Sequence, residues 1–403
     1  MTTTSIPASN PRQSERSATI YLAFVGILIA FGIDVALPAF DDIEADLPTG
    51  GASISLIVTF YFVGMAVGQL FYGPIADRFG RRPTLLAGLA LYVVGALASA
   101  FAPTFGFLLA ARLLWGLGAA AAASLRMAMA RDLFEGDQMA RIVTIVMAVF
   151  MIGPIFIPMV GQLILTVAPW PAVFLAAMTM AIGVMGWTIW FGETLPADRQ
   201  RPLELRPLAE ATNAVFSTRP TIGHILAQTF SGAAFFSFLG SSQPIIDRIY
   251  GREEQFVFFF GGGGVLMVFA LLINNRLIKR YRTRPMTFVT SSILVAASAT
   301  GLVLTLAADG RPSIWIWFGW VAVANTMITT LTPMCSALAL QPMGAQAGTA
   351  SSVLGVITLA GGAGLAAIID ASIDQTVTPM AIGYLVCSLL TVGALRWAGD
   401  PAS

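Results

Sequence analysis

Charged residues are scarce in this chain of 403 residues, where Asp, Glu, Lys and Arg together make up only 11% of the positions. A soluble domain carries about 25% charged residues, so the composition argues against a soluble protein. The 22 basic and 21 acidic side chains leave a net charge of +1. Because nucleic-acid-binding proteins need a basic patch, we expect no nucleic acid partner.

Side chains that bind metals or carry out covalent catalysis are almost missing. His224 is the only histidine, Lys279 is the only lysine, and the two cysteines, Cys335 and Cys387, lie inside apolar runs. We therefore expect no metal, no cofactor and no enzymatic activity, and we interpret the cysteines as buried thiols rather than a disulfide. The glycine run at 261–264 lacks the lysine that a phosphate-binding loop needs, so it indicates close helix packing.

Apolar sequence, by contrast, is abundant, because 57% of the residues are hydrophobic. A window of about 19 residues finds twelve apolar segments, each long enough to span a bilayer. They lie at 18–40, 53–74, 83–101, 104–127, 140–165, 170–192, 221–242, 255–274, 285–307, 313–336, 346–369 and 377–396. Every backbone polar group in hydrocarbon needs a partner within its segment, so each segment is predicted to be a helix. The sequence thus predicts an all-α membrane protein with twelve transmembrane helices.

The longest polar connection separates the sixth predicted span from the seventh and divides the chain into two six-helix bundles. The expected parts are a tail at 1–17, an N-terminal bundle at 18–192, a cytoplasmic linker at 193–220, a C-terminal bundle at 221–396 and a tail at 397–403. The loops at 75–83 and 277–285 share an Arg-aromatic pair, an Arg and a Pro in register. Two parallel halves with a site between them are typical of transporters that rock between two states.

Basic residues fall mainly in the loops on one side of this predicted topology. Only Arg248, Arg252 and Arg311 fall in loops on the other side. Because positively charged loops tend to stay in the cytoplasm, the basic side is predicted to be cytoplasmic, together with both termini. The expected partners are the lipid bilayer and a small-molecule substrate, and no obligatory protein partner is implied.

Two ionisable residues are predicted to lie deep in the membrane, where a charge needs a partner, water or a function. Asp34 lies about 16 residues into the first span and Arg112 about eight residues into the fourth, so at 1.5 Å per residue their depths nearly coincide. We interpret them as a proton-coupling site in which Asp34 binds and releases a proton and Arg112 controls its charge state. The alternatives are that Asp34 caps a helix end near Pro38 and that Arg112 forms a structural ion pair. Arg126 is interpreted as reaching the membrane surface.

The second half has no charge predicted at comparable depth, so we expect proton coupling to reside in the first half. Its interior polar residues are neutral, namely Gln228, Ser237, Gln243, Asn325, Thr326 and Thr329. An aromatic cavity for flat apolar ligands is a further hypothesis, with plain helix packing as its alternative. The residues expected to line it are Tyr61, Trp115, Phe235, Phe236 and Asn325.

Several motifs resemble those of the major facilitator superfamily. The signature loop is matched by Gly-Pro-Ile-Ala-Asp-Arg-Phe-Gly-Arg-Arg at 73–82, the span-four motif by Arg-Leu-Leu-Trp-Gly-Leu-Gly at 112–118, and the antiporter motif by Gly-Pro-Ile-Phe-Ile-Pro-Met-Val-Gly at 153–161. Asp-Val-Ala-Leu-Pro-Ala at 34–39 is similar to the span-one motif of proton-coupled drug exporters. Gly-Gln-Leu at 68–70 and Ala-Arg-Asp-Leu at 130–133 resemble the Bcr/CflA branch of multidrug resistance proteins.

The resemblance implies a major facilitator fold and a proton-coupled antiporter in a bacterial inner membrane that exports drugs or similar lipophilic compounds by alternating access. The signature loop would act as a conformational lock, with Asp77 bound by a facing helix or by Arg141 when the transporter faces outward. The lock residues are Gly73, Asp77, Arg78, Gly80, Arg81, Arg82 and Arg141. The antiporter motif would bend the fifth span and seal the halves, through Gly153, Pro154, Pro158 and Gly161.

Three positions depart from the drug-exporter pattern. Ala36 replaces the usual tyrosine, Asp41 the usual second proline, and Trp115 the usual glutamine. These changes favour an alternative function, the transport of a single natural metabolite. A membrane enzyme acting on lipid is disfavoured, because it needs convergent acid, base or metal groups.

Overall fold

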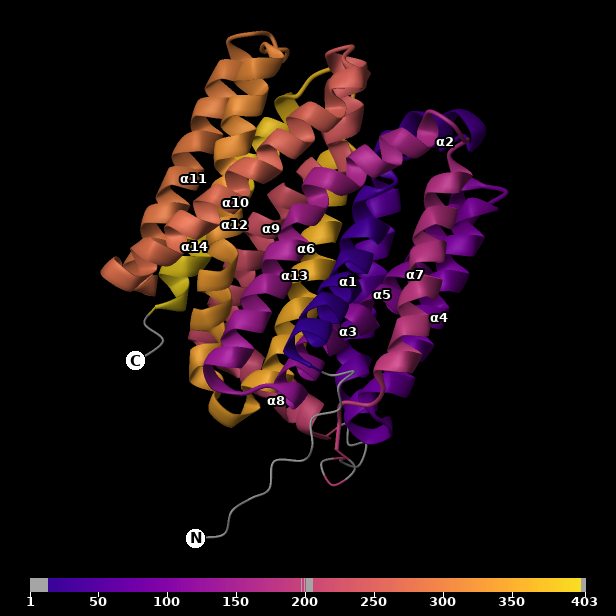
Figure 1. Ribbon diagram of the computed structural model, residues 1–403. Coiled ribbons are helices and arrows are strands. Elements are labelled where there is room, and N and C mark those ends of the chain that lie inside the picture. The colour runs from indigo at the N-terminus through magenta and orange to yellow at the C-terminus, as the bar shows by residue number, and fades with distance from the viewer. Residues whose placement is uncertain (1–13, 197, 199, 201–205, 400–403) are drawn as a thin grey trace.

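The structure of the chain is a computed structural model that describes residues 14–196, 198, 200 and 206–399, and this part is helical and contains no strand (Figure 1). The first half holds α1 (Glu15–Asp34), α2 (Phe40–Asp46), α3 (Leu56–Phe79), α4 (Arg81–Ala100), α5 (Phe105–Leu133), α6 (Gly136–Leu165) and α7 (Pro171–Phe191). The second half holds α9 (Arg219–Pro244), α10 (Phe256–Tyr281), α11 (Thr283–Leu306), α12 (Ile314–Leu340), α13 (Ala347–Asp370) and α14 (Thr378–Ala398), and α8 (Arg206–Ser217) lies between the halves.

The twelve predicted spans are confirmed. Within the described residues, twelve helical segments are long and apolar enough to cross a membrane, and each overlaps one predicted span. The first is longer than predicted, because α1 continues through a 3-10 turn at Leu37–Ala39 into α2 and ends at Asp46. α8 is a helix that the prediction did not contain, since the connection at 193–220 was expected only to be polar.

The helices form the two predicted bundles, with α1 and α3 to α7 in the first and α9 to α14 in the second (Figure 1). The main contacts between the bundles join α3 with α13 and α6 with α10, and α9 also reaches α3 and α2. We call the end at which α1 begins and α14 ends the termini face, and the end that carries α2 the opposite face. The seam is the boundary along which the two bundles meet.

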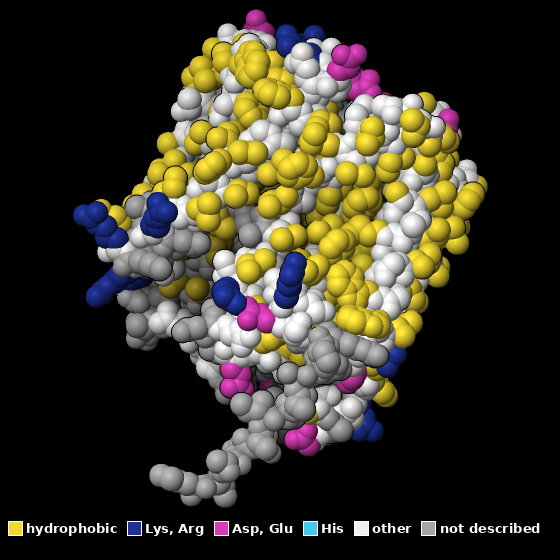
Figure 2. Space-filling model, viewed as in Figure 1, with side chains coloured by type: hydrophobic (Ala, Val, Ile, Leu, Met, Phe, Trp, Pro, Cys, Tyr) yellow, Lys and Arg dark blue, Asp and Glu magenta, His cyan; other side chains and the backbone are white. Residues whose placement is uncertain are grey.

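Large apolar side chains cover the outside of both bundles. Exposed examples are Phe107, Leu163, Ile182, Phe258, Val303, Ile368 and Leu389. Figure 2 shows the hydrophobic side chains spread over the middle of the molecule, with charged side chains toward its two ends. A soluble protein rarely exposes so large an apolar surface, whereas a lipid bilayer covers one without cost. The chain is therefore a multi-pass membrane protein.

Two glycines let α5 lie at the centre of the first bundle, close to two neighbouring helices. A Cβ on Gly116 would lie 2.0 Å from the carbonyl oxygen of Tyr61 on α3, and a Cβ on Gly118 would lie 2.3 Å from the amide nitrogen of Tyr92 on α4. Small residues are what permits backbones to approach this closely in membranes. These contacts fix α5, and with it Arg112, relative to α3 and α4.

Gly116→Ala is expected to destabilise the first bundle. The new methyl group would meet backbone rather than a yielding side chain, so we expect a loss of about 1–3 kcal/mol in the free energy of unfolding. Thermal melting of the purified protein in detergent measures this as a lower Tm. Gly183→Ala on α7 is the control, because a Cβ there meets nothing within 4 Å. Equal Tm values for the two variants would contradict the packing argument.

Candidate functional site

Asp34 lies at a break in the first membrane span. α1 ends at Asp34, and Pro38, four residues later, has no N–H to donate to the Asp34 carbonyl oxygen. The side chain is only 2% exposed. Its Oδ1 atom has no hydrogen-bond partner among the described residues. The alternative that Asp34 lies at a helix end near Pro38 thus fits the backbone, but it leaves the burial of the carboxyl group unexplained.

Three neighbouring helices hold α1 just before this break. Each supplies one side chain that donates a hydrogen bond to a backbone carbonyl oxygen of α1. The pairs are Tyr92 Oη to Leu28 at 2.9 Å, Tyr61 Oη to Ile29 at 3.1 Å and Arg112 Nη1 to Gly32 at 2.8 Å. Because these donors come from α4, α3 and α5, the end of α1 is fixed by most of the first bundle.

Arg112 is 1% exposed and does not form an ion pair with Asp34 within the described structure. Its guanidinium instead lies over the rings of Trp115 and Phe174, 4.7 and 4.6 Å from their centroids. The Nε and Nη2 atoms have no hydrogen-bond partner among the described residues. Both Arg112 and Asp34 act electrostatically on Tyr61, which places these three side chains in one polar group.

The five residues expected to line a cavity lie in two different settings. Trp115 is fully buried, with its ring edge-on to Tyr61, Tyr92 and Phe174, all in the first bundle. Asn325 is also fully buried and accepts a hydrogen bond from Tyr384 within the second bundle. Tyr61, Trp115 and Asn325 therefore lie inside the bundles and not at the seam.

The two phenylalanines of the predicted cavity lie near the seam instead. The ring of Phe236 on α9 lies 4.4 Å from that of Phe62 on α3, so the two bundles touch here. Phe235 lies beside Phe236 at 6.2 Å. Phe62, which was not among the predicted cavity residues, joins them in one aromatic group.

The antiporter motif lies on α6, which runs as one helix with Pro154 and Pro158 inside it. A Cβ on Gly153 would lie 2.8 Å from the Ala30 side chain, and a Cβ on Gly161 would lie 2.5 Å from the Val35 carbonyl oxygen. Both glycines therefore allow α6 to pack against α1 on either side of Asp34.

On its other side, α6 meets the second bundle. Ile155 of the motif packs against the glycine run of α10, where a Cβ on Gly264 would lie 2.7 Å from its side chain. The close packing predicted for that run is therefore found at Gly264. The motif thus lies between Asp34's helix and the seam.

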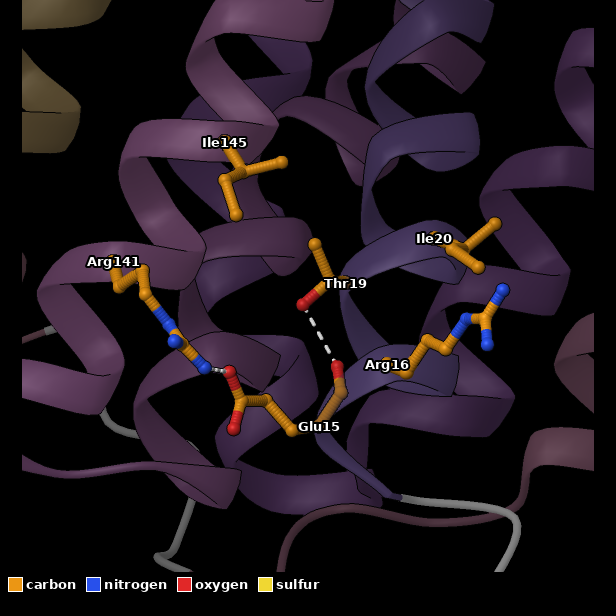
Figure 3. Close-up of a pocket in the computed structure, with 6 residues that line it drawn as sticks. All are labelled: Glu15, Arg16, Thr19, Ile20, Arg141 and Ile145. Atoms are coloured by element: carbon orange, nitrogen blue, oxygen red, sulfur yellow. Dashed lines mark hydrogen bonds and ion pairs between the residues drawn. The ribbon is translucent and has the colours of Figure 1, made fainter.

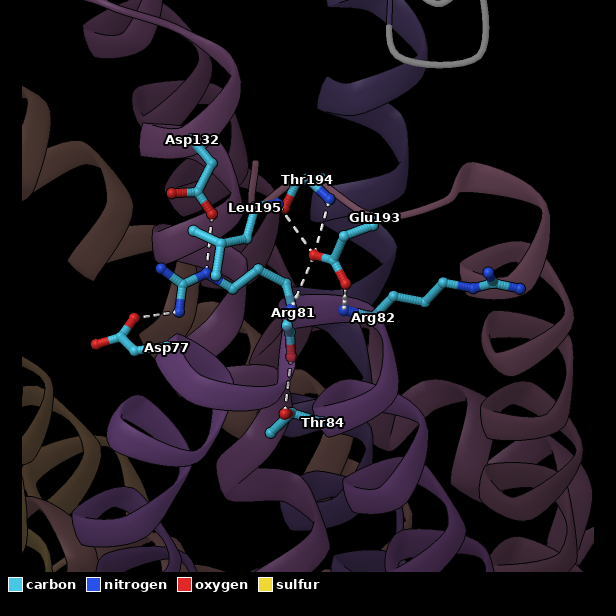
Figure 4. A network of polar contacts seen from close by, with 9 residues as sticks. Asp77, Arg81, Arg82, Thr84, Asp132, Glu193, Thr194 and Leu195 are labelled. Carbon is cyan, nitrogen blue, oxygen red and sulfur yellow. Dashed lines mark hydrogen bonds and ion pairs between the residues drawn. The ribbon is translucent and has the colours of Figure 1, made fainter. Parts of the chain in front are cut away.

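The predicted lock forms a charge network within the first half of the chain (Figure 4). Arg81 pairs with Asp77 at 2.5 Å and with Asp132 at 2.8 Å. Gly80 adopts a φ of 100°, which favours glycine, and this turn starts α4 at Arg81. Arg78 is exposed at the end of α3.

Glu193, after α7, completes the network that Figure 4 shows. Its carboxylate accepts hydrogen bonds from the backbone N–H groups of Arg81 and Arg82, at 2.8 and 3.0 Å. The N–H groups at the start of α4 have no partner within the helix itself, and the helix dipole favours an anion there. The same carboxylate accepts from the N–H groups of Thr194 and Leu195.

Two of the predicted lock residues, Arg141 and Gly73, lie outside this network, so their role in the outward-facing state stays a prediction. Arg141 does not bind Asp77; it pairs with Glu15 in the first turn of α1, beside a surface pocket also lined by Arg16 and Ile145 (Figure 3). Gly73 makes no close helix contact, since a Cβ there would meet nothing within 4 Å.

A polar group on the opposite face joins the two halves, and the sequence did not predict it. Gln243 Nε2 donates to Asp41 Oδ2 at 2.5 Å, and Arg248 Nη2 pairs with Asp41 Oδ1 at 3.0 Å. Arg248 also pairs with Glu44. We call Asp41, Glu44, Gln243 and Arg248 the opposite-face clasp. Asp41, the residue that stands where a proline is usual, is its centre.

A second buried acid also escaped the sequence analysis. Asp370, the last residue of α13, is 3% exposed and lies one residue beyond the predicted eleventh span at 346–369. The sequence predicts no charge in the second half at the depth of Asp34, and it gives no sign of an acid buried at the end of a span. A pattern of apolar residues cannot distinguish an acid at a helix end in water from one turned inward.

Comparison with known proteins finds matches over almost the whole chain. Residues 22–396 match the family described as the Major Facilitator Superfamily. A bicyclomycin resistance protein homolog of Haemophilus influenzae is 30% identical over 386 residues, which cover 94% of this chain and 96% of that protein. The multidrug resistance protein MdtL of Escherichia fergusonii is 28% identical over 381 residues, or 91% and 92% of the two chains.

Solved structures show the same fold at low identity. The xylose transporter XylE from E. coli, in a partially occluded inward open conformation, superposes with a TM-score of 0.74 at 11% identity, and the match covers 95% of this chain and 96% of that one. Identity at this level speaks for the fold alone.

Arg248→Ala is expected to loosen the opposite-face clasp. Removing the guanidinium leaves Asp41 and Glu44 facing each other without a cation, so the halves should separate more readily at this face. Spin labels at Ala45→Cys and Glu254→Cys, in a chain with Cys335→Ala and Cys387→Ala, measure the distance across it. We expect a larger long-distance population in the Arg248→Ala protein.

Arg252→Ala provides the matched control for this experiment. Arg252 donates to Gln255 in its own turn, so its loss should leave the distance distribution unchanged. If Arg248→Ala gave the same distribution as Arg252→Ala, the clasp would not hold the two halves together.

Proposed function

The chain belongs to the major facilitator superfamily, whose members are transporters and not enzymes, and on this premise we propose that it exports small lipophilic, drug-like compounds in exchange for protons. The names of its relatives, which concern bicyclomycin and multidrug resistance, support export of such compounds. The termini face, which carries most of the loop arginines, is then the cytoplasmic face of a bacterial inner membrane.

The burial of Asp34 carries this proposal. An ionised carboxylate inside a membrane protein needs a cation or several hydrogen-bond donors. Asp34 has no ion-pair partner within the described structure, and its Oδ1 atom has no donor. A bound proton removes the charge, so Asp34 is the residue that we assign as the proton carrier.

Arg112 and Tyr61 connect that proton to the position of α1. Both side chains donate hydrogen bonds to carbonyl oxygens of α1 that lie within one and a half turns of Asp34. The two side chains also interact electrostatically with each other. When Asp34 loses its proton, the new negative charge attracts the guanidinium of Arg112 away from the Gly32 carbonyl. The end of α1 is then released, and α6, packed on it through Gly153 and Gly161, moves with it.

The transport cycle follows from which face is closed. In this conformation the clasp closes the opposite face, so substrate enters from the cytoplasmic side. Substrate binding and loss of the Asp34 proton to the cytoplasm favour the outward-facing state. There Asp34 takes a proton from outside and the substrate leaves, so one proton gradient drives repeated export.

The aromatic group of Phe62, Phe235 and Phe236 supports a flat apolar substrate. These rings lie at the seam, which opens as the halves rock, and aromatic faces bind planar apolar ligands through stacking. Trp115 and Asn325 are buried inside the bundles. We therefore propose them as cavity residues only for a conformation in which the bundle interiors open.

Asp34→Asn is expected to abolish export driven by a proton gradient. The amide is similar in size to the acid but cannot bind and release a proton. Purified protein in liposomes, with an imposed pH gradient and a panel of drugs, should give wild-type accumulation of at least one compound. The Asp34→Asn protein should fall to the level of protein-free liposomes, while still binding that compound.

Asp42→Asn on α2 is the control, since this acid is exposed and makes no contact with α1's break. It should transport at the wild-type rate. Uphill transport by Asp34→Asn would remove the mechanism. Transport of one metabolite with no drug in the panel accepted would instead support the alternative function.

A further inference from the structure

Asp370 is a buried acid that the proposed cycle does not use, and it lies where the two halves meet. Its Oδ1 atom accepts a hydrogen bond from Ser237 Oγ on α9 at 2.5 Å. The hydroxyls of Ser241, also on α9, and of Ser55, just before α3, interact with the same carboxyl group. Ser55 belongs to the first half and the others to the second, so the site is complete only when the halves are together.

Gly240 makes this close arrangement possible. A Cβ at that position would lie 2.8 Å from the Ser55 side chain and 2.9 Å from Asp370 Oδ2. The absence of a side chain lets the first half reach the carboxyl group directly. The contact is therefore part of the seam and does not lie in the interior of one bundle.

The arginines of the opposite face all have other partners. Arg248 pairs with Asp41 and Glu44, Arg252 donates to Gln255, and Arg311 donates to the carbonyl oxygen of Gln375. Among the described residues, no ion pair involves Asp370. Hydroxyl groups alone compensate a buried negative charge poorly.

The position of Asp370 at the end of α13 adds to the cost of a charge. The carboxyl terminus of a helix carries a partial negative charge, which repels an anion placed there. The other titratable group facing Asp370 is Tyr384 on α14, which donates to Asn325 and supplies no positive charge. A bound proton removes both penalties at once.

We infer that Asp370 is a second proton-binding site, loaded at the opposite face when the two halves close over it. The role of this second site in transport rests on the proposed proton coupling. When the halves separate at this face, Ser55 withdraws and water reaches the carboxyl group, which then ionises readily. Closing the face takes up one proton, and opening it releases one.

The sign of the pH dependence follows from this linkage. Because the closed face binds the proton more tightly, lowering the pH favours closing. The clasp acids give the opposite sign, since protonating Asp41 or Glu44 weakens their pairs with Arg248 and favours opening. Asp247 of the second half shares a hydrogen bond with Asp41 across the seam, so protonation of that pair favours closing, as it does at Asp370. The Asp370→Asn variant therefore separates Asp370 from the other acids of this face.

The test uses the spin-label pair at positions 45 and 254 in the full-length protein, without substrate or gradient, across mildly acidic to alkaline pH. We expect the ratio of closed to open distances to rise at least about tenfold as the pH falls. Asp370→Asn should remain closed at every pH. Asp374→Asn, an exposed acid four residues later, should respond as the wild type does.

Two further arms keep the inference testable. Ser237→Ala removes one hydrogen-bond donor but keeps the acid, so it should shift the midpoint of the pH response and preserve its direction. This variant tests the site even if the Asp370→Asn protein does not fold. Replacing sodium by choline should change nothing. A response that persists in Asp370→Asn, that has the opposite sign, or that requires sodium would overturn the inference.

The outcomes also separate this inference from the proposed function. If the drug assay shows proton-driven export but Asp370→Asn keeps the full pH response, Asp370 is not a proton site and the proposed function stands. If no proton-driven export is found but Asp370→Asn removes the response, the proton site stands and the proposed function fails.

Discussion

A negative charge inside a membrane protein must be neutralised, and this constraint explains the arrangement of both buried acids. Asp34 is the last residue of α1, at the break inside the first span, and Asp370 is the last residue of α13; at a helix end the dipole disfavours an anion. Neither forms an ion pair within the described part of the chain. The arginines of the clasp and of the lock pair with other acids, and Arg112, although close to Asp34, donates to the Gly32 carbonyl oxygen instead. A proton is the partner that remains.

The first bundle is built so that the charge of Asp34 affects the helix that carries it. Gly116 and Gly118 bring α5 against α3 and α4, and this fixes the donors that hold α1. Pro38 removes a helical hydrogen bond directly after those contacts, and the chain continues there as a 3-10 turn into α2. That chain leads to Asp41, which holds the opposite face closed. The break, the acid and the clasp thus lie on one continuous segment.

Much of the fold could be predicted from the sequence, because a lipid environment imposes both helix formation and span length. All twelve spans, and the depth that Asp34 shares with Arg112, follow from counting residues. Contacts between side chains did not follow. Arg141, one of the two partners expected for Asp77 in the outward-facing state, pairs with Glu15 here, and the sequence does not predict that Glu193 binds the start of α4. These contacts depend on helix rotation and on loop paths, which hydropathy does not specify.

The buried acid of the second half shows the same limit most clearly. Asp370 stands one residue outside the apolar run, where an acid usually meets water, and only the packing of Ser55 and Gly240 encloses it. The aromatic contact between Phe62 and Phe236 likewise depends on how the halves meet. Residues at the seam are the least predictable part of the site, because no single helix determines their surroundings.

The central claim is that substrate and proton compete through Asp34. Its most direct measurement is proton release when a transported drug is added to purified protein in weakly buffered detergent solution. The account predicts acidification on drug binding by the wild-type protein and none by the Asp34→Asn protein, although both bind the drug. Equal acidification by the two proteins would contradict the claim.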